Sequence, residues 1–187
     1  MTITELAPAK LNLTLDVGAR RPDGYHEITS VMQSAALYDV VTLETVETDD
    51  IVVECPGTDL PTGPDNLAWK AADVFFQETN ILRTGIFIRL EKKIPSQAGL
   101  GGGSSDAAAV LRGMRRLFRA NVSDEALETM AARVGSDVPY CVRGGTALAR
   151  GRGERLTALS PLPMCWFVIV KPPVAHSTAV MLSLIHI

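Results

Sequence analysis

The feature that most constrains the fold is a glycine-rich stretch that runs directly into an alanine-rich one, IPSQAGLGGGSSDAAAV at residues 94–110. The apolar segment IFIRLEKKI (86–94) before it is typical of a β-strand. After the glycines, apolar side chains recur at helical spacing: Ala107, Val110, Leu111, Met114, Leu117 and Phe118. We therefore expect a strand, a glycine loop and a helix that begins near residue 105, with Ser104 or Ser105 as its N-cap.

A loop of this kind is suited to binding an anion. Unpaired amides and the helix dipole favour negative charge at a helix N-terminus, and glycine lets the backbone approach it closely. The stretch matches neither the P-loop pattern GxxxxGK[ST] nor a GxGxxG dinucleotide fingerprint. Because the loop contains no lysine, a cation has to come from elsewhere in the chain. The alternative is a structural turn capped by serine.

The rest of the chain mixes strand and helix patterns. Strand patterns occupy five segments: 11–18, 27–46, 51–55, 86–94 and 165–170. Within the first of them, the leucines share one face: Leu11, Leu13 and Leu15. Helical patterns cover 65–78 and about 123–134, and Gly135 ends the second of these. Residues 144–156 are typical of a hairpin, so the expected class is mixed α/β, an α+β arrangement of two layers.

Composition sets further limits. A chain of 187 residues with 47% hydrophobic residues is long enough to bury a full core. Its 18 Lys and Arg against 21 Asp and Glu give a net charge of −3, which argues against nucleic acid and anionic membranes as partners. Four arginines follow the glycine loop at helical spacing and are expected to form a solvated face: Arg112, Arg115, Arg116 and Arg119.

Cysteines and terminal segments indicate the compartment. Cys55, Cys141 and Cys165 are odd in number and form no CxxC pattern, so we expect buried small apolar side chains in a reducing compartment. The start, MTITELAPAK, is not typical of a secretory signal. The apolar run at 164–170 is too short to cross a bilayer. We expect a soluble, cytoplasmic protein.

Three separated blocks of sequence carry a resemblance to a known family. PSQAGLGGGSSDAA (95–108) resembles the phosphate-binding motif of the GHMP kinase superfamily, which includes galactokinase and the homoserine and mevalonate kinases. APAKLNLTLDVGARRPDGYHEITSVMQ (7–33) and GSDVPYCVRGGTALARGRGERL (135–156) are similar to the 4-diphosphocytidyl-2-C-methyl-D-erythritol kinases. The resemblance extends from about residue 7 to residue 179.

The resemblance implies a fold and an activity. The fold is that of GHMP kinases, with an N-terminal domain of the ribosomal-protein-S5-like domain 2 type. The activity is ATP-dependent phosphorylation of the 2-hydroxyl of a cytidine-diphosphate-linked methylerythritol, in the non-mevalonate pathway of isoprenoid biosynthesis. Residues 1–150 would form the ATP-binding domain and residues 151–187 the beginning of an incomplete C-terminal domain. We then expect an intact ATP loop, an incomplete wall on the substrate side, and a final stretch (about 182–187) unlike the family.

The resemblance also implies how ATP is bound. Backbone amides of the glycine loop would wrap the ATP phosphates, and the serine side of the loop would bind the nucleotide with its Mg²⁺, while no residue is assigned as a protein ligand to metal. The implied ATP-binding residues are Pro95, Ser96, Gln97, Ala98, Gly99, Leu100, Gly101, Gly102, Gly103, Ser104 and Ser105.

Two residues match catalytic positions of the family. Phosphoryl transfer to an alcohol needs a group that accepts the hydroxyl proton and a cation that offsets developing charge. The resemblance implies that Asp137 is the base and Lys10 the cation. From the residues alone, Asp137 could equally cap the helix that starts near Pro139, and Lys10 could be an exposed strand lysine.

Substrate contacts are implied at four positions: Asn12, Tyr25, His26 and Thr178. An aromatic ring can stack on a cytosine and an imidazole can hydrogen-bond its edge, which suits the pair in DGYHE. The role of Asp106 stays open between facing solvent and assisting Mg²⁺ through water.

Three hypotheses for the function stay open at this point. The chain is a kinase of the cytidine-diphosphate substrate, another GHMP small-molecule kinase of the homoserine or mevalonate type, or an inactive nucleotide-binding fragment. Either a monomer or a homodimer is expected.

Overall fold

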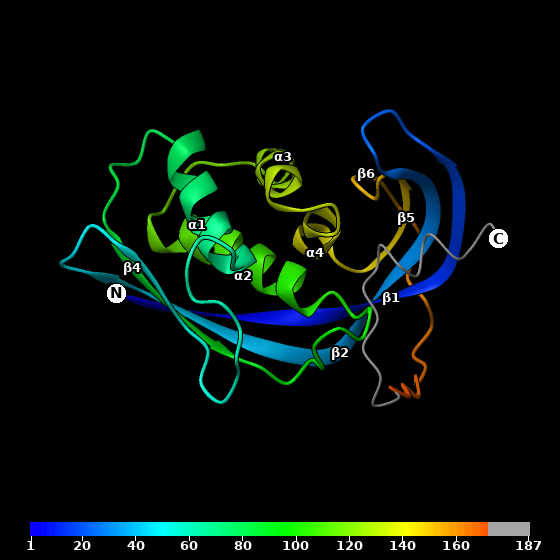
Figure 1. Cartoon of the computed structure of the whole chain (residues 1–187), viewed down its shortest axis with the longest axis horizontal. Helices are drawn as coiled ribbons and strands as arrows, with labels where there is room; N and C mark the ends of the chain where they lie inside the picture. Colours follow the sequence, from blue (N-terminus) through cyan, green and yellow to red (C-terminus); the bar gives the residue numbers. More distant parts are fainter. Residues whose placement is uncertain (172–187) are drawn as a thin grey trace.

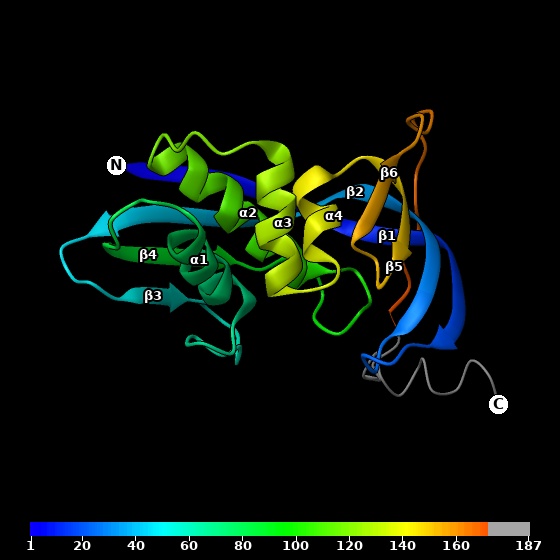
Figure 2. The same ribbon diagram turned by 90° about the horizontal axis from the view of Figure 1, so that it is seen from above.

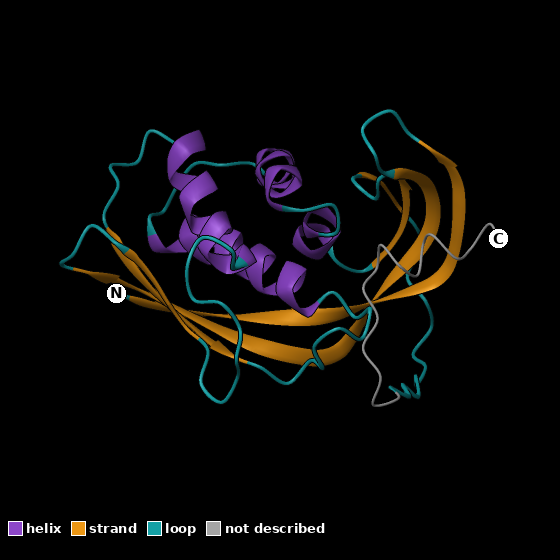
Figure 3. Cartoon of the chain, viewed as in Figure 1, coloured by secondary structure: helices purple, strands orange, loops and turns teal. Residues whose placement is uncertain are grey.

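A six-stranded β-sheet carries four helices on one of its faces in the part of the chain that the computed structural model describes, residues 1–171 (Figures 1 and 3). The strands are β1 (Thr2–Arg20), β2 (His26–Val46), β3 (Ile51–Glu54), β4 (Gly85–Glu91), β5 (Thr146–Gly151) and β6 (Arg155–Ala158). The helices are α1 (Leu67–Glu78), α2 (Gly102–Leu117), α3 (Asp124–Val134) and α4 (Val138–Arg143). The expected two-layer α/β class is confirmed.

The long strand β2 organises the sheet. One of its edges pairs antiparallel with β1 from Thr2↔Glu44 to Arg20↔His26. Its other edge is shared, because residues 28–33 pair with β5 and residues 40–46 pair with β4. The β1–β2 ribbon runs beneath the helices and then curls upward beside β5 and β6 (Figures 1 and 2). Register shifts after Pro8, Asn12 and Val17 mark bulges, which bend a strand and increase its twist.

The core lies between the sheet and the helices. Inward-facing residues of β2 and β4, among them Leu43, Ile86 and Ile88, are fully buried against Phe75 of α1 and Leu111 of α2. Burying one such side chain stabilises the fold by about 1.5–3 kcal/mol. Helix α2 is central in this layer, and its buried face includes small alanines that allow a close approach to the sheet.

The predicted elements match the structure with two exceptions. The strands near 11–18, 27–46, 51–55 and 86–94 are confirmed, as are the helix at 65–78 and the hairpin at 144–156. Helix α3 ends before Gly135, as expected, and Ser123 caps its start. The helix after the glycines begins at Gly102 and not near residue 105.

The predicted buried strand at 165–170 is wrong. The segment forms no strand, and Trp166 and Val168 are 94% and 92% exposed. An apolar run becomes a strand only where another strand offers it hydrogen bonds, and within residues 1–171 no strand pairs with this segment. Cys165 is therefore exposed, whereas Cys55 and Cys141 are buried as expected.

The arginines after the glycine loop do not all form a solvated face. The guanidinium of Arg112 donates to the carbonyl oxygens of Leu6 and Cys141, both at 2.9 Å, and so joins α2 to β1 and α4. Arg116 keeps 57% of its side chain exposed. Among residues 1–171, no helix combines the length and apolar character needed to span a membrane.

Substitution of Gly85 tests how closely the start of β4 packs against Thr48, in the turn that follows β2. A Cβ at this position would lie 1.9 Å from the carbonyl oxygen of Thr48, a backbone atom that cannot move aside cheaply. We expect Gly85→Ala to lower the free energy of unfolding by about 2–3 kcal/mol in urea denaturation. Gly63→Ala is the matched control, because a Cβ there meets no atom within 4 Å. Equal stability of the two variants would contradict this packing.

Candidate functional site

The glycine loop lies on β1. Leu100, at its centre, is buried in a small apolar cluster with Ala9 and Ile94. The carbonyl oxygen of Leu100 also accepts a hydrogen bond of 2.9 Å from the amide of Lys10. Figure 1 shows the chain rising from the end of β4 past the β1–β2 ribbon to the start of α2. The loop is therefore held in place by β1, which carries the predicted catalytic lysine.

The backbone of the loop presents free amides. Three residues adopt positive φ angles, Gln97 at 53°, Gly99 at 70° and Gly101 at 67°. The first hydrogen bond of α2 runs from the amide of Ser105 to the carbonyl of Gly101, at 2.8 Å. The amides of residues 102–104 therefore have no partner within the helix and lie at its positive end. This arrangement suits an anion such as a phosphate.

The predicted serine N-cap is wrong. Gly101 occupies the N-cap position in a left-handed conformation, and no side chain caps the helix. The hydroxyl of Ser105 is buried and donates to the carbonyl oxygen of Pro8 at 2.7 Å, which fastens the start of α2 to β1. Ser104 stays partly exposed at the helix start. A glycine cap leaves the space in front of the amides clear of side chains.

Lys10 is not an exposed strand lysine. Its residue is 6% exposed, and its stem packs so closely on the loop that a Cβ at Gly101 would lie 2.6 Å from its Cγ. Its ammonium forms an ion pair with Asp137, with 3.2 Å between Nζ and Oδ2. It also donates to Oδ1 of Asn12 at 3.1 Å. The structure thus places a buried cation beside the lysine-free loop.

Asp137 lies at the N-cap position of α4 but does not cap it. Its side chain makes no capping hydrogen bond, and its carboxylate, one-third exposed at 33%, is directed toward Lys10. Pro139, in the first turn of α4, is fully compatible with a helix start. The carboxylate therefore combines access to solvent with an adjacent cation, as a group that exchanges protons with a ligand requires.

The hairpin between β1 and β2 carries Tyr25 and His26, the two residues predicted to contact the cytosine of the substrate. Tyr25 is 49% exposed, and the guanidinium carbon of Arg152 lies 4.8 Å from the centre of its ring. Nδ1 of His26 is 3.1 Å from the carbonyl oxygen of Gly18. The turn that holds Arg152 also reaches Asp137, because a Cβ at Gly153 would lie 3.7 Å from the Asp137 carboxylate. One turn therefore contacts both the hairpin and the catalytic region.

The structure brings Lys10, Asn12 and Asp137 together beside Leu100 and Gly101 of the glycine loop. The turn at 151–154 contacts both Asp137 and Tyr25, whereas His26 contacts the carbonyl oxygen of Gly18. Thr178 lies outside the described residues. Within residues 1–171, His, Cys, Asp and Glu side chains form no group of three or more that could hold a metal ion. Cys141, beside the site, is no candidate nucleophile, because burial raises its thiol pKa to about 12.

A buried charged cluster behind the loop was not predicted from the sequence. Lys92, which follows β4, contacts the carboxylates of both Asp39 and Asp106. Asp106 is 2% exposed, so it neither faces solvent nor is open to a hydrated Mg²⁺. One signal could have found Asp39: it falls on the same face of its strand as the core residues Val41 and Leu43, and a carboxylate there needs a partner.

Burial dominates the electrostatics of Asp106. Desolvation raises the pKa of its carboxyl to about 7, and the nearby Lys92 only partly opposes this effect. Its Oδ1 atom has no hydrogen-bond partner among the described residues. The pKa of Lys92 is also raised despite burial, because two carboxylates contact it. Within this cluster, Asp106 is therefore the carboxyl whose charged form burial disfavours most clearly.

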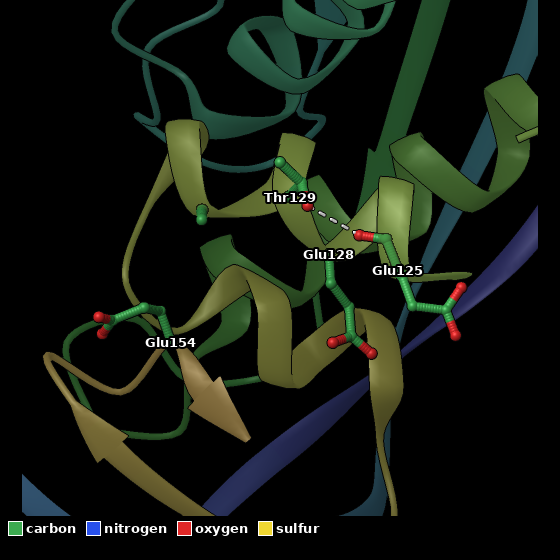
Figure 4. A pocket seen from close by; sticks show the side chains of 5 residues that line it. Glu125, Glu128, Thr129 and Glu154 are labelled. Atoms are coloured by element: carbon green, nitrogen blue, oxygen red, sulfur yellow. Dashed lines mark hydrogen bonds between the residues drawn. The ribbon is translucent and has the colours of Figure 1, made fainter. Parts of the chain in front are cut away.

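A separate pocket on α3 does not carry the candidate site. It is lined by Glu125, Glu128, Thr129, Ala132 and Glu154, and Figure 4 shows the carboxylates around it. None of the residues predicted to bind ATP or substrate lines it. Three carboxylates would repel a polyphosphate, so this pocket is no candidate for the phosphate site.

Comparisons with known proteins agree with this geometry. Residues 66–145 match the family model of the GHMP kinases N terminal domain. A 4-diphosphocytidyl-2-C-methyl-D-erythritol kinase from Heliobacterium modesticaldum is 52% identical over 174 residues, which are 92% of this chain and 55% of that protein. The crystal structure of a 4-(cytidine 5'-diphospho)-2C-methyl-D-erythritol kinase superposes with a TM-score of 0.71 and 42% identity, over 86% of this chain and 56% of that one.

More distant similarity extends to other kinases. A homoserine kinase from Cytophaga hutchinsonii has a TM-score of 0.68 but 21% identity, over 87% of this chain and 52% of that one, and therefore shares the fold alone. The chain spans between 55% and 63% of the length of the first curated relatives that it matches.

The buried carboxyl of Asp106 gives the fold a defined pH dependence. Its folded pKa, about 7, lies above the ordinary value of 3.8, so between these pH values the folded state holds more protons than the unfolded state. The contribution of Asp106 to the free energy of unfolding therefore decreases as the pH rises across that window. Asparagine does not titrate, so the stability of Asp106→Asn lacks this dependence on pH. We expect the free energy of unfolding of Asp106→Asn minus that of the wild type to increase by about 2–3 kcal/mol from pH 5 to pH 8.

Urea denaturation of both proteins at several pH values measures this difference. Glu27 and Asp23, whose pKa values are lowered, act in the opposite direction but are common to both proteins and cancel. A constant stability difference across the range would show that Asp106 does not titrate with a raised pKa.

Proposed function

We propose that the chain belongs to the GHMP kinase family and is the ATP-binding part of a 4-diphosphocytidyl-2-C-methyl-D-erythritol kinase. The enzyme would transfer the terminal phosphoryl group of ATP to the 2-hydroxyl of its substrate, a step in the methylerythritol phosphate pathway of isoprenoid biosynthesis. Relatives at 46–52% identity that bear this enzyme's name support the substrate. Residues 1–150 would form the ATP-binding domain, and residues 151–187 would begin the second one.

The observation that carries the proposal is the ion pair between Lys10 and Asp137 beside the loop amides. The amides of residues 102–104 would hold phosphate oxygens at the helix N-terminus. Lys10, fixed by its contact with Gly101, would offset the negative charge that develops on the transferring group. Asp137 would accept the proton of the substrate hydroxyl and so make its oxygen a better nucleophile.

The exposure of the two groups fits this division of roles. Lys10 is held in a fixed position by three contacts, which suits electrostatic stabilisation because no reorganisation is needed during the reaction. The Asp137 carboxylate is more accessible, as a group that has to meet an incoming hydroxyl must be. Asn12 contacts the same ammonium and would bind the substrate next to the reacting hydroxyl.

Mg²⁺ is proposed as a companion of the nucleotide and not as a resident ion. Magnesium in kinase sites needs only one or two protein ligands, because substrate phosphates and water supply the others. The donors present fit this mode: the partly exposed hydroxyl of Ser104 at the loop and the accessible carboxylate of Asp137. When bound, the ion would neutralise phosphate charge. Asp106 would not be among its ligands, since Lys92 and burial occupy that carboxyl.

Selectivity for a cytidine nucleotide would come from the β1–β2 hairpin. The half-exposed ring of Tyr25 could stack on the base with the face that Arg152 leaves open, and His26 would hydrogen-bond its edge. Thr178 would add a substrate contact. The homoserine and mevalonate kinases share only the fold at 15–21% identity, so they support no second substrate.

A coupled assay of ADP release tests the proposal. The protein that carries this chain is incubated with ATP, Mg²⁺ and, in separate reactions, the cytidine-diphosphate substrate, homoserine and mevalonate. We expect release only with the first. Release with homoserine or mevalonate would overturn the substrate assignment, and nucleotide binding without any turnover would overturn the kinase assignment. Residues 1–187 are assayed in parallel to show whether they suffice.

Asp137→Asn tests the proposed base. The amide keeps the size of the side chain but cannot accept the proton as a carboxylate does, so we expect kcat to fall by about 10²–10⁴-fold. The variant also removes the charged partner of the buried Lys10 ammonium and should lower thermal stability, so kcat is compared at a temperature where both proteins are folded. Asp49→Asn, at an exposed position in the turn after β2, is the control and should retain full activity. A kcat within threefold of the wild type would exclude Asp137 as the base.

A further inference from the structure

Lys92 joins the two ends of the glycine loop. The residue follows β4 and immediately precedes the loop, while Asp106 lies in the second turn of α2, after the loop has ended. The ammonium of Lys92 contacts both Asp106 and Asp39, and Asp39 belongs to β2. One side chain therefore links the beginning of the loop, the helix that follows it and the sheet below.

Asp39 extends this link to the backbone of the loop. Its Oδ1 accepts hydrogen bonds from the amides of Lys93 and Ile94, the second at 2.8 Å. Asp39 itself has no exposed surface, and Gly102 lies directly against it, since a Cβ at Gly102 would be 3.5 Å from Oδ2. The cluster therefore contacts the loop at its entry and at the first residue of α2.

Stability alone does not explain such a cluster. Two buried carboxylates share one ammonium, and Oδ1 of Asp106 lacks a hydrogen-bond partner within residues 1–171. Buried charges of this kind often stabilise a fold no better than apolar side chains of equal volume. What the charges do provide is a defined spacing between three backbone segments, because charge-assisted hydrogen bonds are directional.

We propose that Lys92 is a positioning residue for the phosphates of the nucleotide. By holding Asp39 and Asp106 together it sets where α2 begins relative to β4, and so directs the amides of residues 102–104 toward the phosphates. The inference rests on the proposed function only in that the loop binds polyphosphate. It does not depend on which alcohol is phosphorylated.

The test compares two adjacent lysines. Lys92→Met removes the link, and Lys93→Met, at an exposed neighbour, is the matched control. Binding of tripolyphosphate and of adenosine is measured separately by isothermal titration calorimetry, at a temperature where each protein is folded. We expect Lys92→Met to weaken tripolyphosphate binding at least 10-fold and to leave adenosine binding within twofold. Lys93→Met should bind both ligands as the wild type does.

A double variant separates positioning from stability. Lys92→Met leaves two buried carboxylates facing each other, so it is expected to lower the melting temperature. Lys92→Met/Asp106→Asn removes one of these charges and should recover most of the loss. If the double variant is stable but still binds tripolyphosphate at least 10-fold more weakly, positioning is supported. If its affinity returns to that of the wild type, Lys92 serves stability alone and the proposal is wrong.

Hydrogen exchange of the wild type decides the case in which neither variant folds. An anchored loop predicts that the amides of Lys93 and Ile94 exchange as slowly as those of β4, whereas exchange as fast as in the turn at 47–50 would overturn the inference. A wild type that binds no tripolyphosphate at all would instead contradict the proposed function. An unchanged tripolyphosphate affinity in folded Lys92→Met contradicts the inference alone.

Discussion

The contact between Lys10 and Asp137 depends on almost every element of the fold. Lys10 lies on β1, Asp137 at the start of α4, and the loop that packs on the lysine stem connects β4 to α2. These elements meet because β1 pairs with β2 along its whole length while β4 and β5 share the other edge of β2. A buried ammonium is stable only with partners, and Asp137 and Asn12 supply them.

The site separates its charges by depth. In front of the loop lie one ammonium and the positive end of α2, where a polyphosphate would bind. Behind the loop lie two carboxylates that Lys92 neutralises in part. Without this lysine the carboxylates would face the phosphate site through the thickness of one loop, in a low-dielectric interior where repulsion is strong. A glycine loop without its own lysine is thus compatible with phosphate binding. Lys10 of β1 supplies positive charge in front of the loop, and Lys92 after β4 offsets the carboxylates behind it.

Much of the fold could be predicted from local pattern. Alternation identified part of β1, helical spacing identified α1 and α3, and Gly135 correctly marked the end of α3 because a helix stop is a local property. The start of α2 was misplaced, because the serines look like caps while Gly101 takes that role and Ser105 bonds to β1. The segment at 165–170 was misread because an apolar run does not reveal whether a partner strand exists.

The candidate site could be predicted only where a family motif covered it. Lys10 and Asp137 stand far apart in the chain, and each had an ordinary structural explanation, so only the family resemblance implied the pairing that the structure contains. The cluster of Asp39, Lys92 and Asp106 combines three elements and has no local motif. Pairing between distant segments is set by the topology of the sheet, which no single stretch of sequence encodes.

A crystal structure with a non-hydrolysable ATP analogue tests the central claim most directly. The account predicts that the terminal phosphate lies within about 3 Å of Nζ of Lys10 and that its neighbours accept hydrogen bonds from the amides of residues 102–104. A nucleotide whose phosphates bind elsewhere, with Lys10 still buried against Asp137 and away from them, would contradict it.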